Sequence, residues 1–514
     1  MNGAESLVRT LVAGGVEVCF ANPGTSEMHF VAALDRVVGM RCLLGLFEGV
    51  VTGAADGYAR MARKPASTLL HMGPGLAYGL PNLHNARRAQ VPILNIVGEH
   101  ATHHKRYDAP LTTDIEAIAR PYSHWVRTSA NTANLGRDGA DAIVAASTEP
   151  GQIATLILPA DVAWAEGGVI AAIPPVPAPP VPAPATVSRA TAMLSCDAPT
   201  AIVLGGNALH GPALIAAGRI AAATGARLLA AYAMTRIERG AGRPIVTRVP
   251  YVLEQAAALF KEFRHLILVG APPPVAFFAY PGKPHVPTPE GCDIHVLVRP
   301  GEDCAGALEA LAADVAASGT QPLVQETERP ALPNGEITLP GLAAVVGALL
   351  PENCIVVDEG MTSGRGMLAI TKGAPPHDWL GNTGGAIGIA MPMAVGAAIA
   401  CPGRHVLCLT ADGSGMYTLQ ALWTMAREGL AITTVVFANR SYAILKGEFA
   451  SLGGGPLGPS ASNMLEIGRP DLDWTALAKG MGVQSIRVTT LDAFTKALDA
   501  GFRTKGPSLI EVAL

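Results

Sequence analysis

The sequence predicts an α/β protein with three doubly wound domains, each containing a parallel sheet. Apolar, strand-like runs alternate with amphipathic helical segments through the first third of the chain. Two breaks in composition, a Pro-rich stretch at 173–187 and a looser stretch at 318–334, then divide the sequence. A strand–helix–strand unit lies at 404–445, and 514 residues are enough for about three domains.

The alternation in the first third is regular. Each short apolar run ends near Gly, Pro or Asn, and a helical segment follows. Strands separated by helices pair in parallel, so this order indicates a doubly wound sheet. The expected helices cover about 4–13, 26–37, 51–62 and a segment ending near 88, and the expected strands cover 16–20, 41–46, 67–71 and 93–97.

The composition breaks set the expected domain boundaries. Residues 173–187 read IPPVPAPPVPAPATV, so we expect this stretch to be extended and to take no part in a helix. A second α/β block opens with a strand at 201–204. The expected division is a first domain at 1–170, a linker at 171–188, a middle domain at 189–317, a linker at 318–336 and a third domain at 337–514.

Composition also argues against several kinds of function. Charged residues make up 15% of the chain and the net charge is −4, so neither nucleic acid nor an anionic membrane surface is expected as a partner. The eight Cys form no C-x-x-C pair, which favours reduced thiols and a cytoplasmic location. Residues 381–403 carry no charge, but their Gly content and Pro392 favour a buried helix over a membrane span.

The strand–helix–strand unit contains the clearest candidate site. An apolar run at 406–410 ends at Asp412, a helix is expected at about 417–429, and a second strand at 432–438 ends at Asn439. A right-handed crossover brings Asp412 and Asn439 to the same carboxyl edge. Carboxylate and amide oxygens suit a hard cation, and the amides of Gly413 and Ser414 at a helix start suit a phosphate. The alternative is an ordinary crossover unit with polar loops.

The pattern Asp412-Gly413, followed 27 positions later by Asn439, resembles the thiamine diphosphate motif of the 2-oxo-acid decarboxylase and acetolactate synthase superfamily. The resemblance implies that Mg²⁺ is held by Asp412, Asn439 and the main-chain carbonyl of Ser441. Ala411 and Ala438 depart from the usual letters, and neither change removes a ligand. The three-block plan is also that of the superfamily, whose domains are pyrimidine-binding, middle and diphosphate-binding.

Glu48 opens the run E-G-V-V-T-G-A-A-D-G-Y-A-R. Taken alone, it is an acid at the polar start of a helix. In the superfamily, a Glu before such a run hydrogen-bonds the aminopyrimidine ring of the cofactor. Because Glu48 and Asp412 belong to different domains, the resemblance implies a homodimer or homotetramer with active sites between subunits.

The resemblance implies further contacts to thiamine diphosphate. Ile387 in G-G-A-I-G-I-A-M-P matches the bulky residue that supports the bent cofactor, although plain core packing also explains it. FAD, which some relatives bind, is not favoured because Gly205-Gly206-Asn207 is only a weak nucleotide signal. The other implied cofactor contacts are Gly385, Gly413, Ser414, Thr362, Ser363 and Tyr442.

The candidate substrate residues lie in the first domain. Asn22 to Glu27 resembles the N-P-G-S-N-E turn of benzoylformate decarboxylases and places Thr25 at their active-site Ser. His71 falls at their catalytic His, although a lone His at a strand end is more often a packed residue. Their second His aligns near Phe277, where this chain has none.

These features lead to one functional hypothesis and two alternatives. We expect a thiamine diphosphate- and magnesium-dependent enzyme that decarboxylates a 2-oxo acid and joins the product to a second carbonyl compound, as acetolactate synthases do. A benzoylformate-type decarboxylase that releases an aldehyde is the first alternative, and the missing second His argues against it. A non-catalytic homologue acting as a partner subunit is the second.

Overall fold

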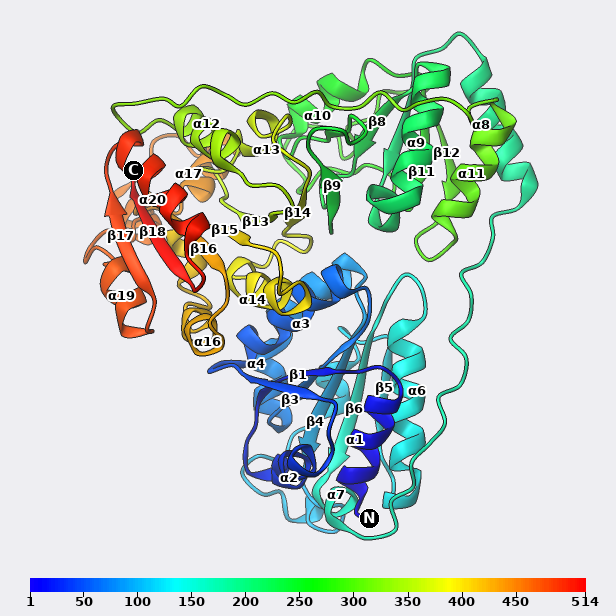
Figure 1. Ribbon diagram of the computed structural model, residues 1–514, viewed down its shortest axis with the longest axis vertical. Helices are drawn as coiled ribbons and strands as arrows, with labels where there is room; N and C mark the ends of the chain where they lie inside the picture. Colours follow the sequence, from blue (N-terminus) through cyan, green and yellow to red (C-terminus); the bar gives the residue numbers. More distant parts are fainter.

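The computed structural model describes residues 1–514 and contains three α/β units, each built on one sheet. Figure 1 shows the N-terminal unit at the bottom, the middle unit at the upper right and the C-terminal unit at the upper left. All strand pairs are parallel except one, in which β9 joins the edge of the third sheet. The predicted fold class is therefore confirmed.

The N-terminal unit has a six-stranded sheet with helices on both faces. The strand order is β2-β1-β3-β4-β6-β5. One face packs on α1, α2, α6 and α7, and the other packs on α3, α4 and α5. The elements are α1 (Gly3–Ala13), β1 (Val18–Asn22), α2 (Met28–Arg36), β2 (Arg41–Leu44), α3 (Glu48–Ala62), β3 (Ala66–Leu70), α4 (Met72–Ala89), β4 (Ile93–Glu99), α5 (Ile115–Ala119), β5 (Trp125–Thr128), α6 (Leu135–Ser147), β6 (Ile153–Pro159) and α7 (Ala160–Trp164).

The middle unit has a five-stranded sheet in the order β10-β8-β7-β11-β12. Helices α8, α9 and α11 cover one face, and α10 covers the other. The elements are α8 (Pro184–Ser195), β7 (Thr200–Leu204), α9 (Gly211–Thr224), β8 (Arg227–Ala230), β10 (Thr247–Arg248), α10 (Leu253–Phe260), β11 (His265–Val269), β12 (Asp293–Val298) and α11 (Cys304–Asp314).

The C-terminal unit has a seven-stranded sheet in the order β17-β18-β16-β15-β13-β14-β9. Its last strand, β9 (Ile237–Arg239), comes from the middle segment of the chain and pairs antiparallel with β14. The sequence did not indicate this exchange between units. The other elements are α12 (Leu339–Leu349), β13 (Ile355–Glu359), α13 (Met367–Ile370), β14 (His377–Gly381), α14 (Ala390–Ala400), β15 (Val406–Ala411), α15 (Asp412–Gly415), α16 (Ala421–Glu428), β16 (Ile432–Ala438), α17 (Ala443–Ser451), α18 (Pro459–Leu465), α19 (Trp474–Gly480), β17 (Gln484–Val488), α20 (Leu491–Arg503) and β18 (Ser508–Ala513).

Two extended segments connect the units. The Pro-rich segment runs along the outside of the molecule from α7 to α8, on the right in Figure 1. The prediction that residues 173–187 contain no helix is wrong at its end, because α8 begins at Pro184. Proline is tolerated at the first position of a helix, where its missing N–H would have no partner within the helix.

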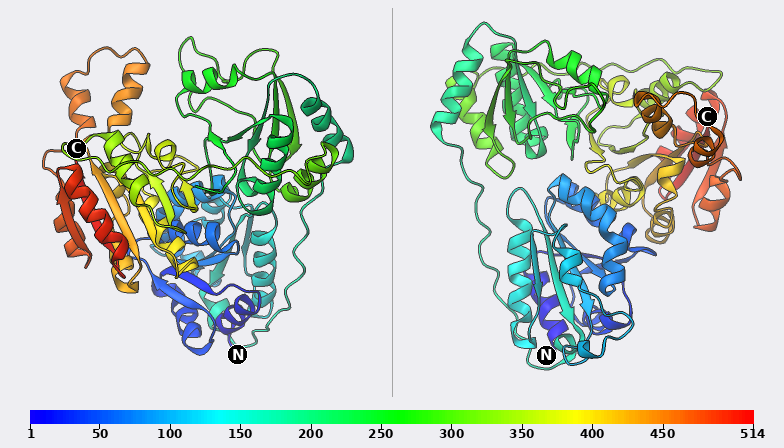
Figure 2. Two further views of the ribbon diagram at one scale, coloured as in Figure 1. Left: turned by 45° about the horizontal axis from the view of Figure 1, so that its top comes forward. Right: turned by 180° about the vertical axis from the view of Figure 1, so that it is seen from behind.

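The units share hydrophobic cores. The largest core of the N-terminal unit continues into the C-terminal unit, where α3 packs on α14; Figure 2 shows these helices side by side at the centre of the molecule. Helix α14 confirms the buried helix expected within 381–403. No helix in the structure combines the length and the apolar character that crossing a membrane requires.

Glycine makes the close contact between α3 and α14 possible. A Cβ at Gly57 would lie 2.1 Å from the carbonyl oxygen of Met393, and a Cβ at Gly396 would lie 1.9 Å from that of Ala54. Both overlaps involve backbone atoms, which cannot move away as a flexible side chain would. The two glycines therefore set the distance between the units that carry the candidate site.

We expect Gly57→Val to lower the free energy of unfolding by about 3 kcal/mol or more, because the added atoms must separate α3 from α14. Urea denaturation of the purified chain measures this change. Gly447→Ala is the matched control: Gly447 lies within α17 with open space around it, so alanine should be neutral or slightly stabilising. Equal stability of the two variants would contradict the proposed close packing.

Candidate functional site

The carboxyl edge of the C-terminal sheet brings Asp412 and Asn439 together. Ala411 at the end of β15 pairs with Phe437 near the end of β16, so the residues after these strands emerge side by side. The Asp412 carboxylate accepts hydrogen bonds from the N–H groups of Gly413 at 2.8 Å and Arg440 at 2.6 Å. These two bonds join the two loops.

The charge of Asp412 has no cationic partner in the chain. The residue is 2% exposed, and no Lys, Arg or His side chain forms an ion pair with it. Burial raises the pKa of the Asp412 carboxyl, while the N–H donors of Arg440 and Gly413 oppose the rise. A buried carboxylate beside an amide oxygen and without a counter-charge fits a hard divalent cation.

The predicted helix at 417–429 is wrong in its first turn. A four-residue turn of helix, α15, starts at Asp412, and α16 starts only at Ala421. Between them, the Thr418 hydroxyl donates to the carbonyl of Gly388 at 2.7 Å and holds the chain against the loop before α14. Ser414 and Gly413 are therefore buried beside that loop rather than placed on a separate long helix.

The loop between β14 and α14 carries Gly385 and Ile387. Gly385 has φ +80° and Gly388 has φ +93°, conformations that favour glycine. A Cβ at Gly388 would lie 2.5 Å from the Cβ of Tyr417, so this loop closely contacts the segment that follows Asp412. Ile387 is half-buried in the same loop, at the same edge of the sheet as Asp412.

Glu359 holds this loop in place, although no sequence pattern indicated it as a site residue. It ends β13 and is 2% exposed. Its carboxylate accepts hydrogen bonds from the N–H groups of Gly388 at 3.0 Å and Ala390 at 3.1 Å, and from the Asn382 amide at 3.2 Å. Burial raises the pKa of Glu359 to about 7. The only sequence signal was an acidic pair directly after a buried apolar run.

The Glu359 pKa predicts a pH dependence of stability. Its folded pKa of about 7 lies above the ordinary value of 4.5, so the folded state binds the proton more tightly than the unfolded state. This contribution to stability is fully present below pH 4.5 and is lost as the pH rises to 7, on the order of 3 kcal/mol in total.

We expect Glu359→Gln, which stays neutral, to lack this loss of stability. Urea denaturation of the wild type and the variant at pH 5 and pH 7.5 measures the difference. Glu466→Gln, at an exposed carboxylate paired with Arg469, is the control. Its free energy of unfolding should change between pH 5 and pH 7.5 as much as that of the wild type. If Glu359→Gln loses as much stability as the wild type between these two pH values, Glu359 is not the source of the pH dependence.

Three other predicted cofactor residues lie near the same edge. Thr362 and Ser363 follow β13, the neighbour of β15 in the sheet, and Ser363 is 4% exposed. Tyr442 is half-buried, and its ring lies 2.7 Å from the position of a Cβ on Gly413. Ser441 follows Asn439 closely, and its N–H donates to the Asn439 side-chain oxygen at 3.0 Å. The structure thus collects all the predicted diphosphate and metal residues at one edge.

Glu48 belongs to a second group of polar residues, in the N-terminal unit. It is the first residue of α3 and is 7% exposed. Burial raises the pKa of its carboxyl. A Cβ added to Gly75 would lie 3.1 Å from Glu48 Oε1. The carboxylate therefore lies against the first turn of α4, next to His71. No hydrogen bond or ion pair connects Glu48 to Asp412 within one chain.

His71 is oriented by Glu27, the last residue of the Asn22 to Glu27 turn, for which the sequence pattern predicted no role. The His71 Nδ1 lies 2.9 Å from Glu27 Oε2, and the Ser26 hydroxyl donates to Glu27 Oε1 at 2.6 Å. The N–H of Gly24 also donates to Glu27 at 2.8 Å. A proton on Nδ1 would be donated to Glu27, which leaves Nε2 free. Thr25 is exposed in the same turn.

The middle unit contributes aromatic side chains. Phe277 lies against the loop between β14 and α14, and its Cζ would be 3.1 Å from a Cβ added to Gly385. Tyr251 and Tyr232 pack on the same ring, with centroids 5.3 and 6.2 Å away. Tyr251 also donates to Glu448 on α17 at 3.1 Å. These contacts place aromatic rings beside the loop that carries Ile387.

A cavity of about 660 Å³ separates the middle and C-terminal units. Glu359 and Asn382 line it on one side, and Tyr232 and Tyr251 line it on the other. Its volume lies within the range of small-molecule sites. The structure contains no group of three or more His, Cys, Asp or Glu side chains placed to hold a metal, so a cation at Asp412 needs the Asn439 amide and main-chain carbonyls.

Comparison with known proteins identifies the class. Residues 1–118 match the thiamine pyrophosphate enzyme N-terminal TPP binding domain, and residues 362–512 match the C-terminal TPP binding domain of the same enzymes. The chain therefore belongs to the thiamine pyrophosphate enzyme family, as its sequence resemblance indicated, and it is an enzyme that depends on this cofactor, also called thiamine diphosphate.

Individual relatives cover the whole chain. A Mycobacterium tuberculosis protein that carries the name of an acetolactate synthase large subunit, IlvX, is 54% identical over 100% of this chain and 99% of its own. Benzoylformate decarboxylase of Pseudomonas aeruginosa is 28% identical over 97% and 96%. The structure of a Rhodococcus jostii 4-hydroxybenzoylformate decarboxylase, 23% identical, covers 100% of this chain and 99% of its own with a TM-score of 0.87, which supports the fold.

Proposed function

We propose that this protein is a thiamine diphosphate- and magnesium-dependent enzyme that decarboxylates a 2-oxo acid and joins the product to a second carbonyl compound. The observation that carries the proposal is the buried Asp412 carboxylate, which lies beside Asn439 and forms no ion pair with a Lys, Arg or His side chain. The 54% identity to a protein named as an acetolactate synthase large subunit supports the carboligation step.

The residues at the C-terminal edge fit a diphosphate held through a cation. Asp412, the Asn439 amide oxygen and the main-chain carbonyl of Ser441 would hold Mg²⁺, since all three offer oxygen ligands. The N–H group of Ser414 and the hydroxyls of Thr362 and Ser363 would hold the phosphate oxygens. Gly413, whose N–H donates to Asp412, would let the backbone approach them closely. Tyr442, Gly385 and Ile387 would contact the rest of the cofactor. Glu359 fixes the position of Ile387, because it accepts hydrogen bonds from the loop that carries this residue.

Bound thiamine diphosphate would supply a nucleophilic carbon and a positively charged ring that can accept the electrons released by decarboxylation. The chain's own residues supply proton transfer and orientation. Glu48, buried at the start of α3, would hold a proton at the aminopyrimidine ring. His71, oriented by Glu27, would bind the substrate carboxylate when protonated or transfer a proton when neutral. Thr25, in the turn that carries Glu27, would contact substrate.

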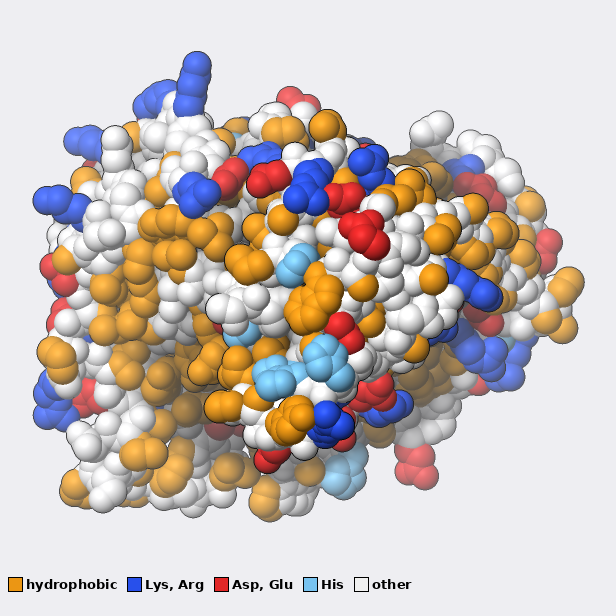
Figure 3. All heavy atoms as spheres, turned by 90° about the horizontal axis from the view of Figure 1, so that it is seen from below, with side chains coloured by type: hydrophobic (Ala, Val, Ile, Leu, Met, Phe, Trp, Pro, Cys, Tyr) orange, Lys and Arg blue, Asp and Glu red, His pale blue; other side chains and the backbone are white.

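The active site would be completed by a second copy of the chain. Hydrophobic side chains near both polar groups are exposed in the single chain: Tyr78 at 59% near Glu48, and Tyr417 at 54% near Asp412. Figure 3 shows hydrophobic side chains spread over much of the face seen from below. Burial of such side chains in a homodimer or homotetramer would bring Glu48 of one protomer to Asp412 of its partner.

A second candidate function is decarboxylation with release of an aldehyde. The aromatic rings of Phe277, Tyr232 and Tyr251 favour it, because they provide an apolar wall for an aryl 2-oxo acid. The relatives named as benzoylformate decarboxylases support the same candidate. Phe277 cannot deliver a proton, however, and aldehyde release needs one.

We expect Phe277→His to increase the fraction of aldehyde among the products by about tenfold, because it places a titratable group beside Gly385. Product analysis by chromatography after incubation with benzoylformate or pyruvate measures this fraction. Phe278→His, on the neighbouring exposed ring, is the matched control and should leave the product ratio unchanged. An equal shift in both variants would rule out a specific role for position 277.

The proposed function is tested by reconstitution. The purified chain is supplied with thiamine diphosphate and Mg²⁺, offered pyruvate and benzoylformate separately, and its products are identified. Acetolactate from pyruvate supports carboligation, and benzaldehyde from benzoylformate supports the second candidate. Binding of the cofactor without any dependence on Mg²⁺ would overturn the proposed role of Asp412.

A further inference from the structure

A second cavity, of about 310 Å³, lies between the N-terminal and middle units. It is distinct from the candidate active site, because it contains none of the residues at the carboxyl edge of the C-terminal sheet. Four cationic side chains line it together with His210. The cations are Arg60, Arg63, Lys64 and Arg236.

The charges around this cavity leave a cation without a partner. Lys64 pairs with Glu17, Arg60 with Asp56, and Arg236 with Asp378. Arg63 forms no ion pair and no side-chain hydrogen bond with the rest of the chain. Two acidic residues also line the cavity: Glu149 accepts a hydrogen bond from the Asn207 amide at 3.0 Å, and Glu302 accepts one from the N–H of Arg299 at 2.6 Å.

The backbone also holds Arg63 at the cavity. It follows the last turn of α3 with φ 56°, at a position where glycine is usual. The Arg63 side chain is exposed at the mouth of the cavity, where solvent or a bound anion can reach its guanidinium group. The guanidinium group is suited to phosphate because it offers several N–H donors in one plane.

His210 provides an independent observation. It lines the cavity, is 9% exposed, and its ring nitrogens form no hydrogen bond with the rest of the chain. It directly precedes Gly211, the first residue of the 14-residue helix α9. Neither ring nitrogen belongs to the fully buried unpaired atoms of the chain, so the ring nitrogens stay accessible from the cavity. A bound anion could accept a hydrogen bond from it.

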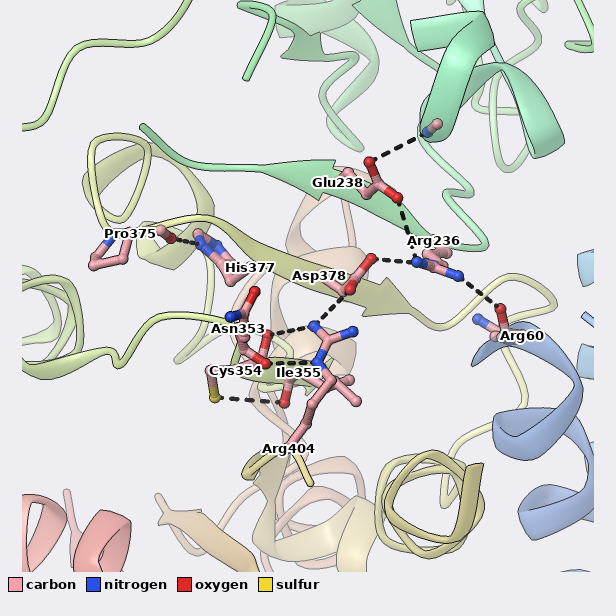
Figure 4. Close-up of polar contacts among 11 residues, drawn as sticks. Arg60, Arg236, Glu238, Asn353, Cys354, Ile355, Pro375, His377, Asp378 and Arg404 are labelled. Carbon is pink, nitrogen blue, oxygen red and sulfur yellow. Dashed lines mark hydrogen bonds and ion pairs between the residues drawn. The ribbon is translucent and has the colours of Figure 1, made fainter. Parts of the chain in front are cut away.

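Two arginines connect the cavity to the loop between β14 and α14, which carries Gly385 and Ile387. Figure 4 shows Arg236 between Asp378 and the backbone of Arg60, with Nε 2.7 Å from Asp378 Oδ1 and Nη1 3.4 Å from the Arg60 carbonyl. The same Asp378 accepts from Arg404 at 2.6 Å. Arg60 in turn donates to the carbonyl of Gly381 at 2.7 Å and to the Thr383 hydroxyl at 3.3 Å.

These bonds reach the start of the loop that carries Gly385 and Ile387. Asp378 lies in β14, which ends at Gly381, and Thr383 lies two residues before Gly385. Glu238 completes the network, accepting from the N–H of Gly211 at 3.2 Å and from Arg236 at 3.4 Å. An anion that draws Arg236 or His210 toward the cavity would therefore act on groups bonded to this loop.

We propose that this cavity is an effector site for a small metabolite carrying one phosphate group, with Arg63 and His210 as its main contacts. The volume of about 310 Å³ has room for a small molecule and not for a dinucleotide such as FAD. The crevice between β7 and β11 offers no further space, because a Cβ at Gly205 would lie 2.6 Å from the carbonyl oxygen of Gly270.

Calorimetry with inorganic phosphate tests the proposal. The chain is first saturated with thiamine diphosphate and Mg²⁺, so that phosphate cannot enter the cofactor site. We expect saturable binding that Arg63→Gly weakens at least tenfold, while its melting temperature stays equal or rises because glycine accepts φ 56°. His210→Gln should weaken binding too. Arg264→Ala, an exposed cation outside the cavity, should change nothing.

The effector role has its own measurement. Phosphate should change the dissociation constant of thiamine diphosphate by about fivefold or more, and the cofactor should change that of phosphate by the same factor. Absence of saturable phosphate binding, or binding that survives both Arg63→Gly and His210→Gln, overturns the site. Binding that leaves the cofactor affinity unchanged overturns the effector role.

Discussion

Glu48→Gln is expected to lower kcat by about 100-fold or more while leaving the fold intact. Glu48 is 7% exposed, and burial raises the pKa of its carboxyl group, which favours the protonated form that can donate a hydrogen bond. Glutamine keeps the shape and loses the proton transfer. Since the ionised Glu48 is disfavoured by burial, a neutral side chain should leave the melting temperature unchanged or slightly higher.

Steady-state kinetics with saturating cofactor, together with a thermal melt of the same sample, measures both effects. Glu166→Gln, at a carboxylate of the same unit whose side chain is 78% exposed, is the control and should keep full activity. Cofactor affinity should fall much less than kcat, because the diphosphate contacts lie in another unit. Wild-type turnover in Glu48→Gln would contradict its role as the acid at the aminopyrimidine ring.

The C-terminal half of the site could be predicted because parallel strands bring their following loops to one edge. Asp412 and Asn439 each come directly after an apolar strand, and the observed pairing of Ala411 with Phe437 places them side by side. The same rule explains why Thr362 lies near them, since β13 is the neighbour of β15. Local sequence and the topology of a crossover were sufficient for Asp412 and Asn439, whereas Thr362 was expected only from the family resemblance.

Contacts between distant segments were not predictable in this way. Glu359 bonds the N–H groups of Gly388 and Ala390, about 30 positions later, and nothing near Glu359 in the sequence specifies those partners. The Glu27–His71 pair is separated by 44 positions. The pairing of β9 with β14 spans two units of the chain, because a three-residue strand carries too little pattern to reveal its partner.

The prolines of the linker predicted only part of its structure correctly. Its absent N–H predicted an extended linker, which the structure has over most of the segment, yet α8 begins at Pro184. A proline inside a helix breaks a hydrogen bond, whereas one at the first position breaks none. The distinction depends on where the helix begins, and that start is set by the packing of α8 on α11 and β12.

Asp412→Asn is expected to weaken the magnesium-linked binding of thiamine diphosphate by about 100-fold or more. Asp412 is the one charged group among the proposed ligands, so its loss removes the main attraction for a divalent cation. Titration of the cofactor at several Mg²⁺ concentrations measures the change. A wild-type chain should gain thermal stability from cofactor and Mg²⁺ together, because both bind only the folded state. The variant should gain little or none.

The control for Asp412→Asn must separate loss of a ligand from loss of negative charge in the region. Asp471 is suitable, because it is close enough to raise the pKa of Asp412 but is 40% exposed and paired with Arg440 and Arg487. We expect Asp471→Asn to retain magnesium-linked binding within about twofold, since an exposed charge is screened by solvent. If both variants lose the same magnesium-linked affinity, Mg²⁺ responds to the overall negative charge at this edge of the sheet. Asp412 would then not be a direct ligand.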